Sequence, residues 1–458
     1  MSGARGRLVR VAIYMVIGLV MFDESGVAVA LTEIRESFDL SPTQANWVVS
    51  AYLLSLSAAV AACGRLADLL GLGRVFIAGS LVFGAMSVAA GLAPSYEWLI
   101  VARVLQGLGA AAAFPAGASI IRATTAEGEL GRALGQLGLA TAIGLAAGPF
   151  LGGLLTQWIS WRAVFFVSAP VVAFVVAVIA SQLEPLERES SQGSFDFGGL
   201  VLLLIALGAT VGGLMQGPVW GWASPTTLAL FAAGAIAGVA LLWVERRRTG
   251  PLIEIDLFRD PTFSSANAMT FLAQFSKTSV VIYGPLFLID VLGLGTFQAG
   301  LALLPGILAA MPSAPLGGRA VDRLGARRPL LGSLALLAAS LAYFAAVVGL
   351  RSYAWLVPGL LVWGVANTCV FVCSRRAVHG AVPATKAGQA SGINSTAQWL
   401  GAALSVPILG VFVVSPPEHF ARVYGAAALF VVAASLLALA RFQPSTGQRP
   451  AGSRPIPA

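Results

Sequence analysis

The sequence predicts an all-α polytopic membrane protein with fourteen spans, arranged as two six-helix bundles with two extra helices inserted between them. Three observations support this fold class. Of 458 residues, 57% are hydrophobic and only 10% are charged, whereas soluble domains carry about 25% charged residues. Fourteen apolar segments are each long enough to cross a bilayer, which takes about 20 helical residues. A loop motif of the first half recurs in the second. This composition argues against a water-soluble enzyme.

The predicted spans follow one another along the chain with short connections. Six of them come first, near residues 11–31, 45–64, 75–94, 98–120, 132–156 and 163–183. Two inserted spans follow near 196–216 and 225–244. The last six are expected near 265–289, 296–316, 329–349, 354–374, 388–413 and 420–440.

The spans divide the chain into five parts. The stretches 11–183 and 264–441 are nearly equal in length, and each is expected to form a six-helix bundle. Residues 1–10 are expected to be a cytoplasmic N-terminus, 184–263 a linker that contains the two inserted spans, and 442–458 a cytoplasmic tail. The first span is long for a signal peptide and contains two acidic residues, so a retained helix is expected.

The basic residues predict the orientation of the chain. The net charge is +8, with 28 Lys and Arg residues. With a cytoplasmic N-terminus, 22 of them, including the run Arg246–Arg248, fall on the cytoplasmic side and four on the other. Such a split follows the positive-inside rule and places both termini in the cytoplasm. The charge therefore indicates insertion in a lipid bilayer rather than nucleic-acid binding.

Few residues could hold a metal or a cofactor. The three cysteines lie in apolar runs, and both histidines lie in short polar connections. Cys369 and Cys373 are four residues apart on one predicted helix, where a disulfide is sterically implausible. We therefore expect no metal and no cofactor.

The internal repeat joins the second and third helices of each half. Its first copy comprises Gly64, Arg65, Asp68, Gly71 and Arg74. The second copy lies 254 residues later and comprises Gly318, Arg319, Asp322, Gly325 and Arg328, with Arg323 beside them. Repeated six-helix halves are a transporter architecture, with the substrate site between the halves near the midplane. Two unrelated basic turns are the alternative. If the two copies are a true repeat, Asp68 and Asp322 are expected to cap helix N-termini or to pair with Arg65, Arg74, Arg319 or Arg323.

Four motifs resemble those of the major facilitator superfamily, and the fourteen spans resemble its drug:proton antiporter branch. The loop motif Gly-x-Leu-Ala-Asp-x-x-Gly starts at Gly64, although Leu69, Leu72 and Gly73 replace the usual basic residues. The fourth span contains Arg-x-x-Gln-Gly-x-Gly-Ala from Arg103, and the first has an acidic motif at Asp23. The fifth span carries the antiporter pattern, with Gly144, Gly148, Pro149 and Gly152. The resemblance implies two bundles around a central cavity that the first and fourth helices of each half line.

Four ionisable residues lie within spans, where a charge needs a cavity or a partner: Asp23, Glu24, Arg103 and Lys277. At about 1.5 Å per residue, Asp23 and Arg103 are at similar depths. A carboxyl that loses and regains contact with an Arg can release and take up a proton. We expect Asp23 first, and Glu24 second, to couple protons, with Arg103 as modulator. A static neutralising pair is the alternative. Adjacent residues point about 100° apart, so Asp23 and Glu24 must differ in role.

Lys277 would repel a cationic substrate unless Glu24 or another acid pairs with it. It is a candidate for binding an anionic group on the substrate, with a snorkelling lysine as the alternative. Asp290 ends the same span and is either functional or an ordinary residue of the outer mouth. Further candidates for an apolar substrate pocket are Gln106, Phe114, Phe271, Phe275, Trp363 and Asn367, and with weaker support Asn394, Gln398 and Trp399. Core or lipid packing is the alternative for each.

The fifth-span motif also has a mechanical interpretation. Pro149 lacks an N–H and crowds the carbonyl of Leu145, which favours a bend. Gly144, Gly148 and Gly152 form a smooth stripe that allows close helix approach. Such a contact could seal the cavity, or serve ordinary packing.

Together these features predict a proton-coupled antiporter in the cytoplasmic membrane of a bacterium. It would act as a monomer and export hydrophobic or amphipathic molecules, such as drugs or secondary metabolites, by alternating access. The alternatives are an importer or a lipid exporter of the same fold, and a transporter-like sensor. A membrane enzyme is disfavoured because no nucleophile–base pair is visible.

Overall fold

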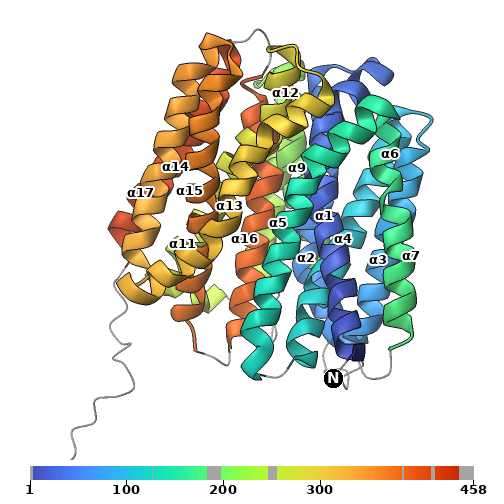
Figure 1. The fold of residues 1–458 in the computed structure, drawn as a ribbon, viewed down its shortest axis with the longest axis vertical. Helices are drawn as coiled ribbons and strands as arrows, with labels where there is room; N and C mark the ends of the chain where they lie inside the picture. Colours follow the sequence, from blue (N-terminus) through green and yellow to red (C-terminus); the bar gives the residue numbers. More distant parts are fainter. Residues whose placement is uncertain are drawn as a thin grey trace, which may run out of the picture.

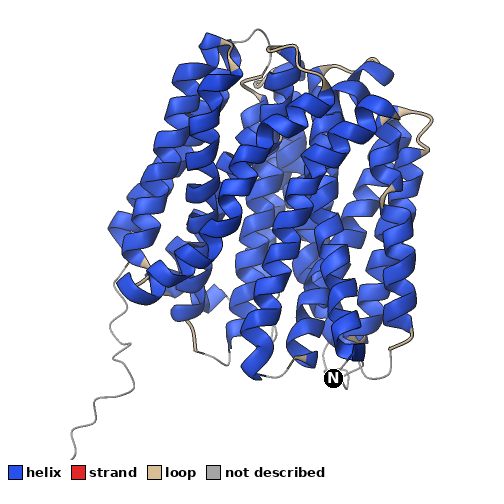
Figure 2. Cartoon of the chain, in the orientation of Figure 1, coloured by secondary structure: helices blue, strands red, loops and turns tan. Residues whose placement is uncertain are grey.

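The computed structural model describes residues 4–125, 127–182, 197–245, 255–383, 386–413 and 418–442. Within these ranges every regular element is a helix (Figure 2). Of the predicted features, the basic run Arg246–Arg248 and the tail from residue 443 lie outside the described residues.

The N-terminal half, here the helices α1 to α7, forms one side of the molecule (Figure 1). Its helices are α1 (Ala4–Ser37), α2 (Pro42–Leu70), α3 (Leu72–Gly91), α4 (Tyr96–Thr124), α5 (Glu127–Trp158), α6 (Trp161–Phe166) and α7 (Ser168–Ala180). The inserted helices are α9 (Phe197–Trp220) and α10 (Pro225–Glu245).

The C-terminal half, here η1 to α17, forms the other side (Figure 1). It comprises η1 (Ile255–Arg259), α11 (Pro261–Val281), α12 (Tyr283–Asp290), α13 (Thr296–Leu324), α14 (Arg327–Val347), η2 (Val348–Leu350), α15 (Tyr353–Gly380), α16 (Ala387–Gly410) and α17 (Glu418–Arg441).

The helices match the predicted spans in number and order. Among the described residues, thirteen helical segments are long and apolar enough to cross a membrane. The remaining predicted span, 388–413, corresponds to α16, whose first half is rich in Ser, Asn, Thr and Gln. At 24 residues α16 is also long enough to cross. The predicted limits are too short at several ends, since α1 extends from Ala4 to Ser37 where 11–31 was predicted.

Two of the spans are broken helices, and a proline explains each break. The sixth span divides into α6 and α7 at Val167, and the ninth into α11 and α12 at Ile282. Pro170 and Pro285 follow the breaks, lack an N–H, and crowd the carbonyls of Phe166 and Val281 four residues earlier. The helix of the ninth span is therefore interrupted at Ile282, shortly after Lys277.

The two halves meet mainly along two pairs of helices, α5 with α13 and α2 with α16, and α1 also contacts α12 and α13. Figure 1 shows α5 and α13 side by side near the upper end of the view. The inserted helix α9 packs on both α2 and α16, and α10 packs on α9. The large apolar side chains of this inserted pair include exposed ones at Ile205, Ile236 and Val239, as expected for a surface that faces lipid.

Candidate functional site

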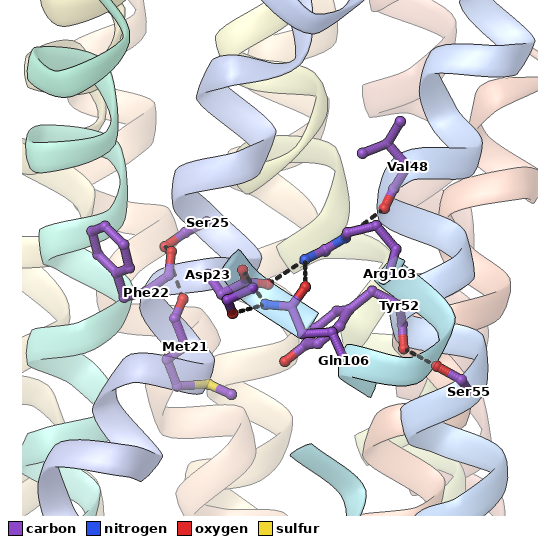
Figure 3. A network of polar contacts seen from close by, with 10 residues as sticks. Met21, Phe22, Asp23, Ser25, Val48, Tyr52, Ser55, Arg103 and Gln106 are labelled. Atoms are coloured by element: carbon purple, nitrogen blue, oxygen red, sulfur yellow. Dashed lines mark hydrogen bonds and ion pairs between the residues drawn. The ribbon is translucent and has the colours of Figure 1, made fainter. Parts of the chain in front are cut away.

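A buried polar network joins α1, α2, α3 and α4 in the N-terminal half, and Figure 3 shows its members Asp23, Val48, Arg103 and Gln106. Arg103 Nη1 donates to Asp23 Oδ2 at 2.6 Å and to Gln106 Oε1 at 2.6 Å. Gln106 Nε2 donates to Asp23 Oδ1 at 2.8 Å and to Ser87 Oγ at 2.6 Å. Arg103 Nε donates to the carbonyl of Val48 at 2.9 Å. Both carboxylate oxygens of Asp23 are thus held from α4.

The network is closed off from solvent. Arg103 is 0% exposed and Asp23 2%. The guanidinium carbon of Arg103 lies 4.3 Å from the ring centre of Tyr52 and 5.7 Å from that of Phe165. Its Nη2 has no hydrogen-bond partner among the described residues. A buried pair in this setting is neutral as a unit, but loss of either partner leaves an uncompensated charge at a cost of about 3–5 kcal/mol.

A second buried ion pair connects the two halves. Lys277 Nζ on α11 donates to Glu24 Oε1 at 2.7 Å and to Oε2 at 2.9 Å. Glu24 is 3% exposed and Lys277 7%. Lys277 therefore has the acidic partner that a mid-span lysine requires, and the alternative of a snorkelling side chain is wrong in this conformation.

Helical geometry sends the two adjacent acids to different partners. The turn of about 100° per residue directs Asp23 toward α4 and Glu24 toward α11. The prediction that these two side chains differ in orientation is confirmed, as is the predicted proximity of Asp23 and Arg103. The four charges form two matched pairs, so the centre of the molecule carries no net charge.

The glycines of the antiporter pattern lie where α5 packs on α1. A Cβ added at Gly144 would overlap the backbone carbonyl of Gly18, and one at Gly148 would overlap Ser25 Oγ. Ser25 Oγ also donates to the carbonyl of Leu145 across the contact, at 3.1 Å. A Cβ at Gly152 would lie 2.9 Å from the Cα of Gly26. This stripe therefore sets how closely α5 approaches the helix that carries Asp23 and Glu24.

The opposite face of α5 contacts the C-terminal half. A Cβ added at Gly300 of α13 would overlap the carbonyl of Pro149. Phe297 N donates to Gln157 Oε1 at 2.9 Å, and the rings of Phe297 and Trp158 are 4.8 Å apart. The α5 segment from Pro149 onward is thus packed between α1 and α13.

The aromatic candidates are dispersed. Phe114 of α4 meets Trp399 of α16 edge-to-face at 5.6 Å, so this pair bridges the two halves. Phe275 stacks on Phe430 of α17 at 3.9 Å, inside the C-terminal half, and acts there as a packing residue. Phe271 lies 6.0 Å from Phe275. The expected aromatic pocket is therefore not assembled from these four residues in this conformation.

Some polar candidates in the C-terminal half have hydrogen-bond partners and others do not. Trp363 Nε1 donates to Ser276 Oγ at 3.0 Å. Asn394 Nδ2 donates to Asn267 Oδ1 at 3.1 Å. Asn367 Oδ1, by contrast, is buried and has no partner among the described residues. Gln398 is half-buried on α16.

The repeated loop motifs end α2 and α13 in the same way. Gly71 and Gly325 are the C-terminal caps of these helices and have φ values of 100° and 73°, a region that only glycine adopts readily. Gly64 and Arg65 lie near the end of α2, and Gly318 and Arg323 near the end of α13.

One expected partner in this motif is wrong. Asp322 pairs with Arg376 of α15 at 2.8 Å rather than with Arg319 or Arg323, because its side chain reaches across to the neighbouring helix. In the first half, Asp68 near the end of α2 and Arg74 near the start of α3 each have an interaction partner.

Asp290 forms an ion pair with Arg35, a partner that could not be identified from the sequence. Arg35, at the end of α1, donates from Nη1 and Nη2 to the two oxygens of Asp290 at 3.2 and 3.3 Å. Both side chains are 29% exposed. The same helix α1 therefore contacts the C-terminal half at two levels, through Glu24 and through Arg35.

Sequence reasoning missed three buried polar residues: Ser87 bonds to Gln106 in the network around Asp23, whereas the side-chain polar atoms of Tyr52 and Gln274 have no partner among the described residues. Ser87, Tyr52 and Gln274 are buried polar residues that carry no charge, so they resemble the many hydroxyl and amide residues of ordinary spans. Their polarity within an apolar run was the only available signal. A small apolar cavity of about 10 Å³ also lies within the C-terminal half, lined by residues such as Phe287, Leu303 and Tyr424. No group of metal-ligating residues occurs among the described residues.

Comparisons with known proteins agree on one family. The model of the Major Facilitator Superfamily matches residues 13–406. The chain is 33% identical over 393 residues to multidrug resistance protein Stp of Mycobacterium tuberculosis (strain CDC 1551 / Oshkosh), covering 86% of this chain and 73% of the relative. It is 32% identical to the tetracenomycin C resistance and export protein of Streptomyces glaucescens, covering 90% and 77%. It is also 32% identical to the cephamycin export protein CmcT of Amycolatopsis lactamdurans, covering 93% and 91%.

A solved structure shows the same fold. The crystal structure of the peptide transporter POT in complex with sulfate matches with a TM-score of 0.69 at 19% identity, covering 94% of both chains. At this identity the likeness concerns the arrangement of helices only.

Proposed function

This chain belongs to the Major Facilitator Superfamily, and we propose that it is a proton-coupled antiporter that exports hydrophobic or amphipathic small molecules by alternating access. The relatives described above include a multidrug resistance protein and two antibiotic export proteins, which supports an outgoing cargo of this kind. The protein would act as a monomer in the cytoplasmic membrane of a bacterium, with both termini in the cytoplasm.

The observation that carries this proposal is the buried contact of Asp23 with Arg103 and Gln106. In the closed network both oxygens of this carboxylate accept hydrogen bonds, one from the guanidinium of Arg103 and one from the amide of Gln106. A movement of α1 relative to α4 that separated them would leave a buried carboxylate without its partner. Proton uptake would then relieve the lone charge, and return of Arg103 would expel the proton. A proton gradient could thereby drive the movement in one direction.

The tight contact between α1 and α5 gives this movement a path. Glycines bring the backbones of α1 and α5 into direct contact, so a shift of α1 would act on α5, which also packs on α13 of the opposite half. A local change at Asp23 is therefore passed to the interface between the halves. The candidates for cargo contact are Lys277, Phe114, Gln106, Phe271, Trp363 and Asn367, together with Phe275 if its stack on Phe430 opens.

The test is proton-driven transport by the purified protein in liposomes with an imposed pH gradient. Asp23→Asn should abolish accumulation of cargo against its gradient while exchange down the gradient persists. Glu36→Gln removes an exposed acid from the same helix and should behave as the wild type. If Asp23→Asn and Glu24→Gln both leave proton-driven accumulation unchanged, the coupling assignment is wrong. Cargo that moves with the protons would instead indicate an importer, and the absence of any transport a sensor.

A further inference from the structure

The C-terminal half contains a buried glutamine whose amide is unpaired. Gln274 on α11 is 1% exposed, and neither its Nε2 nor its Oε1 has a hydrogen-bond partner among the described residues. Its aliphatic stem packs on α16, where a Cβ added at Gly401 would lie 3.1 Å from Gln274 Cβ and Cγ. Buried polar groups are nearly always paired in native proteins. An amide with both its donor and its acceptor unused therefore indicates a group that binds there at another stage.

This amide lies next to the ion pair that crosses between the halves. Gln274 precedes Lys277 by three residues, so their side chains occupy neighbouring positions on α11. Asn367 on α15 supplies a second buried and unpaired amide oxygen, one turn after Trp363, whose indole already contacts α11 at Ser276. Gln274 and Asn367 thus provide unpaired neutral amide atoms on α11 and α15.

The charged side chains at the centre, by contrast, form two matched ion pairs, in which only Nη2 of Arg103 lacks a hydrogen-bond partner among the described residues. Asp23 pairs with Arg103 and Glu24 with Lys277, each at hydrogen-bond distance. A lipophilic cation entering here would find no free carboxylate and would face two cations already buried. An anion would likewise have to displace Glu24 from Lys277 and leave a carboxylate stranded. Either cargo would add an uncompensated charge to a buried site that is neutral without it.

We infer that the cargo carries no net charge and presents a hydrogen-bond donor beside an acceptor, and that Gln274 binds both. This inference rests on the proposed export function and narrows its cargo. The Gln274 amide donates from Nε2 and accepts at Oε1, which matches an amide, or a hydroxyl beside a carbonyl, on an otherwise apolar molecule. Because the two ion pairs are neutral, they offer no opposite charge to a charged molecule, which would then carry an uncompensated charge into the buried site.

The first test measures cargo selectivity and the role of Gln274. Proteoliposomes are given matched pairs of aromatic compounds, each an uncharged amide and its counterpart with a quaternary ammonium in place of the amide. The uncharged members should have a kcat/KM at least tenfold higher. Gln274→Leu should raise their KM at least tenfold while Tm stays the same or rises, because leucine removes the unpaired amide. A structural glutamine would lower Tm and leave KM unchanged. Gln136→Leu, at an exposed glutamine of α5, is the control.

The second test removes one charge of the crossing pair. Lys277→Gln leaves Glu24 without a partner and should raise transport of the quaternary compounds at least tenfold. The double variant Glu24→Gln/Lys277→Gln is neutral again and should return to the wild-type preference. Arg259→Gln breaks an exposed pair with Asp256 and should change nothing. If Lys277→Gln does not fold, calorimetric binding of each matched pair to the wild type decides the question.

Two outcomes separate this inference from the function on which it rests. If the wild type moves or binds the quaternary compounds as well as the uncharged ones, the assigned cargo class is wrong. Proton-driven accumulation of either kind would still support the exporter. If no compound moves under any gradient, both the exporter proposal and the cargo class fail.

Discussion

At the scale of single residues, the central feature is that two neighbouring acids serve different partners. Asp23 is bound within one half by Arg103 and Gln106, whereas Glu24 reaches Lys277 in the other half. A change at Asp23 therefore alters the interior of one bundle, and a change at Glu24 alters the connection between the two. Each acid has a cation partner, as expected because a buried charge without a partner is costly.

Removing one partner of the buried pair Asp23–Arg103 should lower the stability strongly, and removing the second partner as well should restore it. Arg103→Met should lower the free energy of unfolding by about 3–5 kcal/mol, because it leaves Asp23 buried and unpaired. Adding Asp23→Asn to this variant should restore most of the loss, since no charge then remains. Thermal unfolding in detergent measures both effects. Arg259→Met, which breaks a pair exposed by 85% and 71%, should have no measurable effect. A double variant no more stable than Arg103→Met would contradict the neutral-pair account.

At the scale of elements, glycine position decides which helices can approach each other. Along α5, Gly144 and Gly148 lie directly against the backbone of α1, while Gly135 and Gly138 have no atom within 4 Å of an added Cβ. All four residues are glycines, but only at Gly144 and Gly148 does the close contact with α1 leave no room for a side chain. The C-terminal caps Gly71 and Gly325 are required for a different reason, their positive φ.

This difference predicts opposite effects of one substitution on the same helix. Gly144→Ala should destabilise the protein by about 1–3 kcal/mol, because the methyl group overlaps the carbonyl of Gly18 and forces the helices apart. Gly138→Ala should be neutral or stabilise by up to about 1 kcal/mol, since alanine favours helix and nothing opposes its Cβ. Thermal unfolding of the two variants, run side by side, makes the comparison. Equal Tm values would show that the stripe is not a close contact.

At the scale of the whole molecule, specific contacts join the halves at the end where α1 finishes, away from the N-terminus (Figure 1). Arg35 pairs with Asp290, and Gln157 accepts from the backbone of Phe297. Alternating access requires the halves to separate at one end and close at the other, so these contacts must break once in each transport cycle.

A cross-link at this end should therefore stop transport. In a chain whose three cysteines are replaced by serine, Gln157→Cys and Phe297→Cys joined by a short thiol reagent should abolish transport, and cleavage of the linker should restore it. The control is Tyr343→Cys with Trp355→Cys, positions that contact each other within the C-terminal half. The linked control should transport normally. Undiminished transport by the linked Gln157–Phe297 variant would exclude opening at this end.

Much of the fold was predictable because membrane insertion imposes simple rules on the sequence. A chain with few charges must bury its backbone polar groups in helices of spanning length, which yields the number and order of the helices. The repeat at Gly64 and Gly318 predicted two related halves, and the helix caps at Gly71 and Gly325 follow it. The breaks at Val167 and Ile282 were not predicted, although Pro170 and Pro285 marked them in the sequence.

The sequence alone determined which residues had to find partners, since a charge within a span is costly wherever it occurs. It therefore selected Asp23, Glu24, Arg103 and Lys277. Only the tertiary structure decided the pairing, because partners such as Glu24 and Lys277 are 253 residues apart and their contact depends on how the two halves pack. The same holds for uncharged groups: Gln274 is ordinary in sequence, and only the packing of α11 on α16 shows that its buried amide has no partner among the described residues.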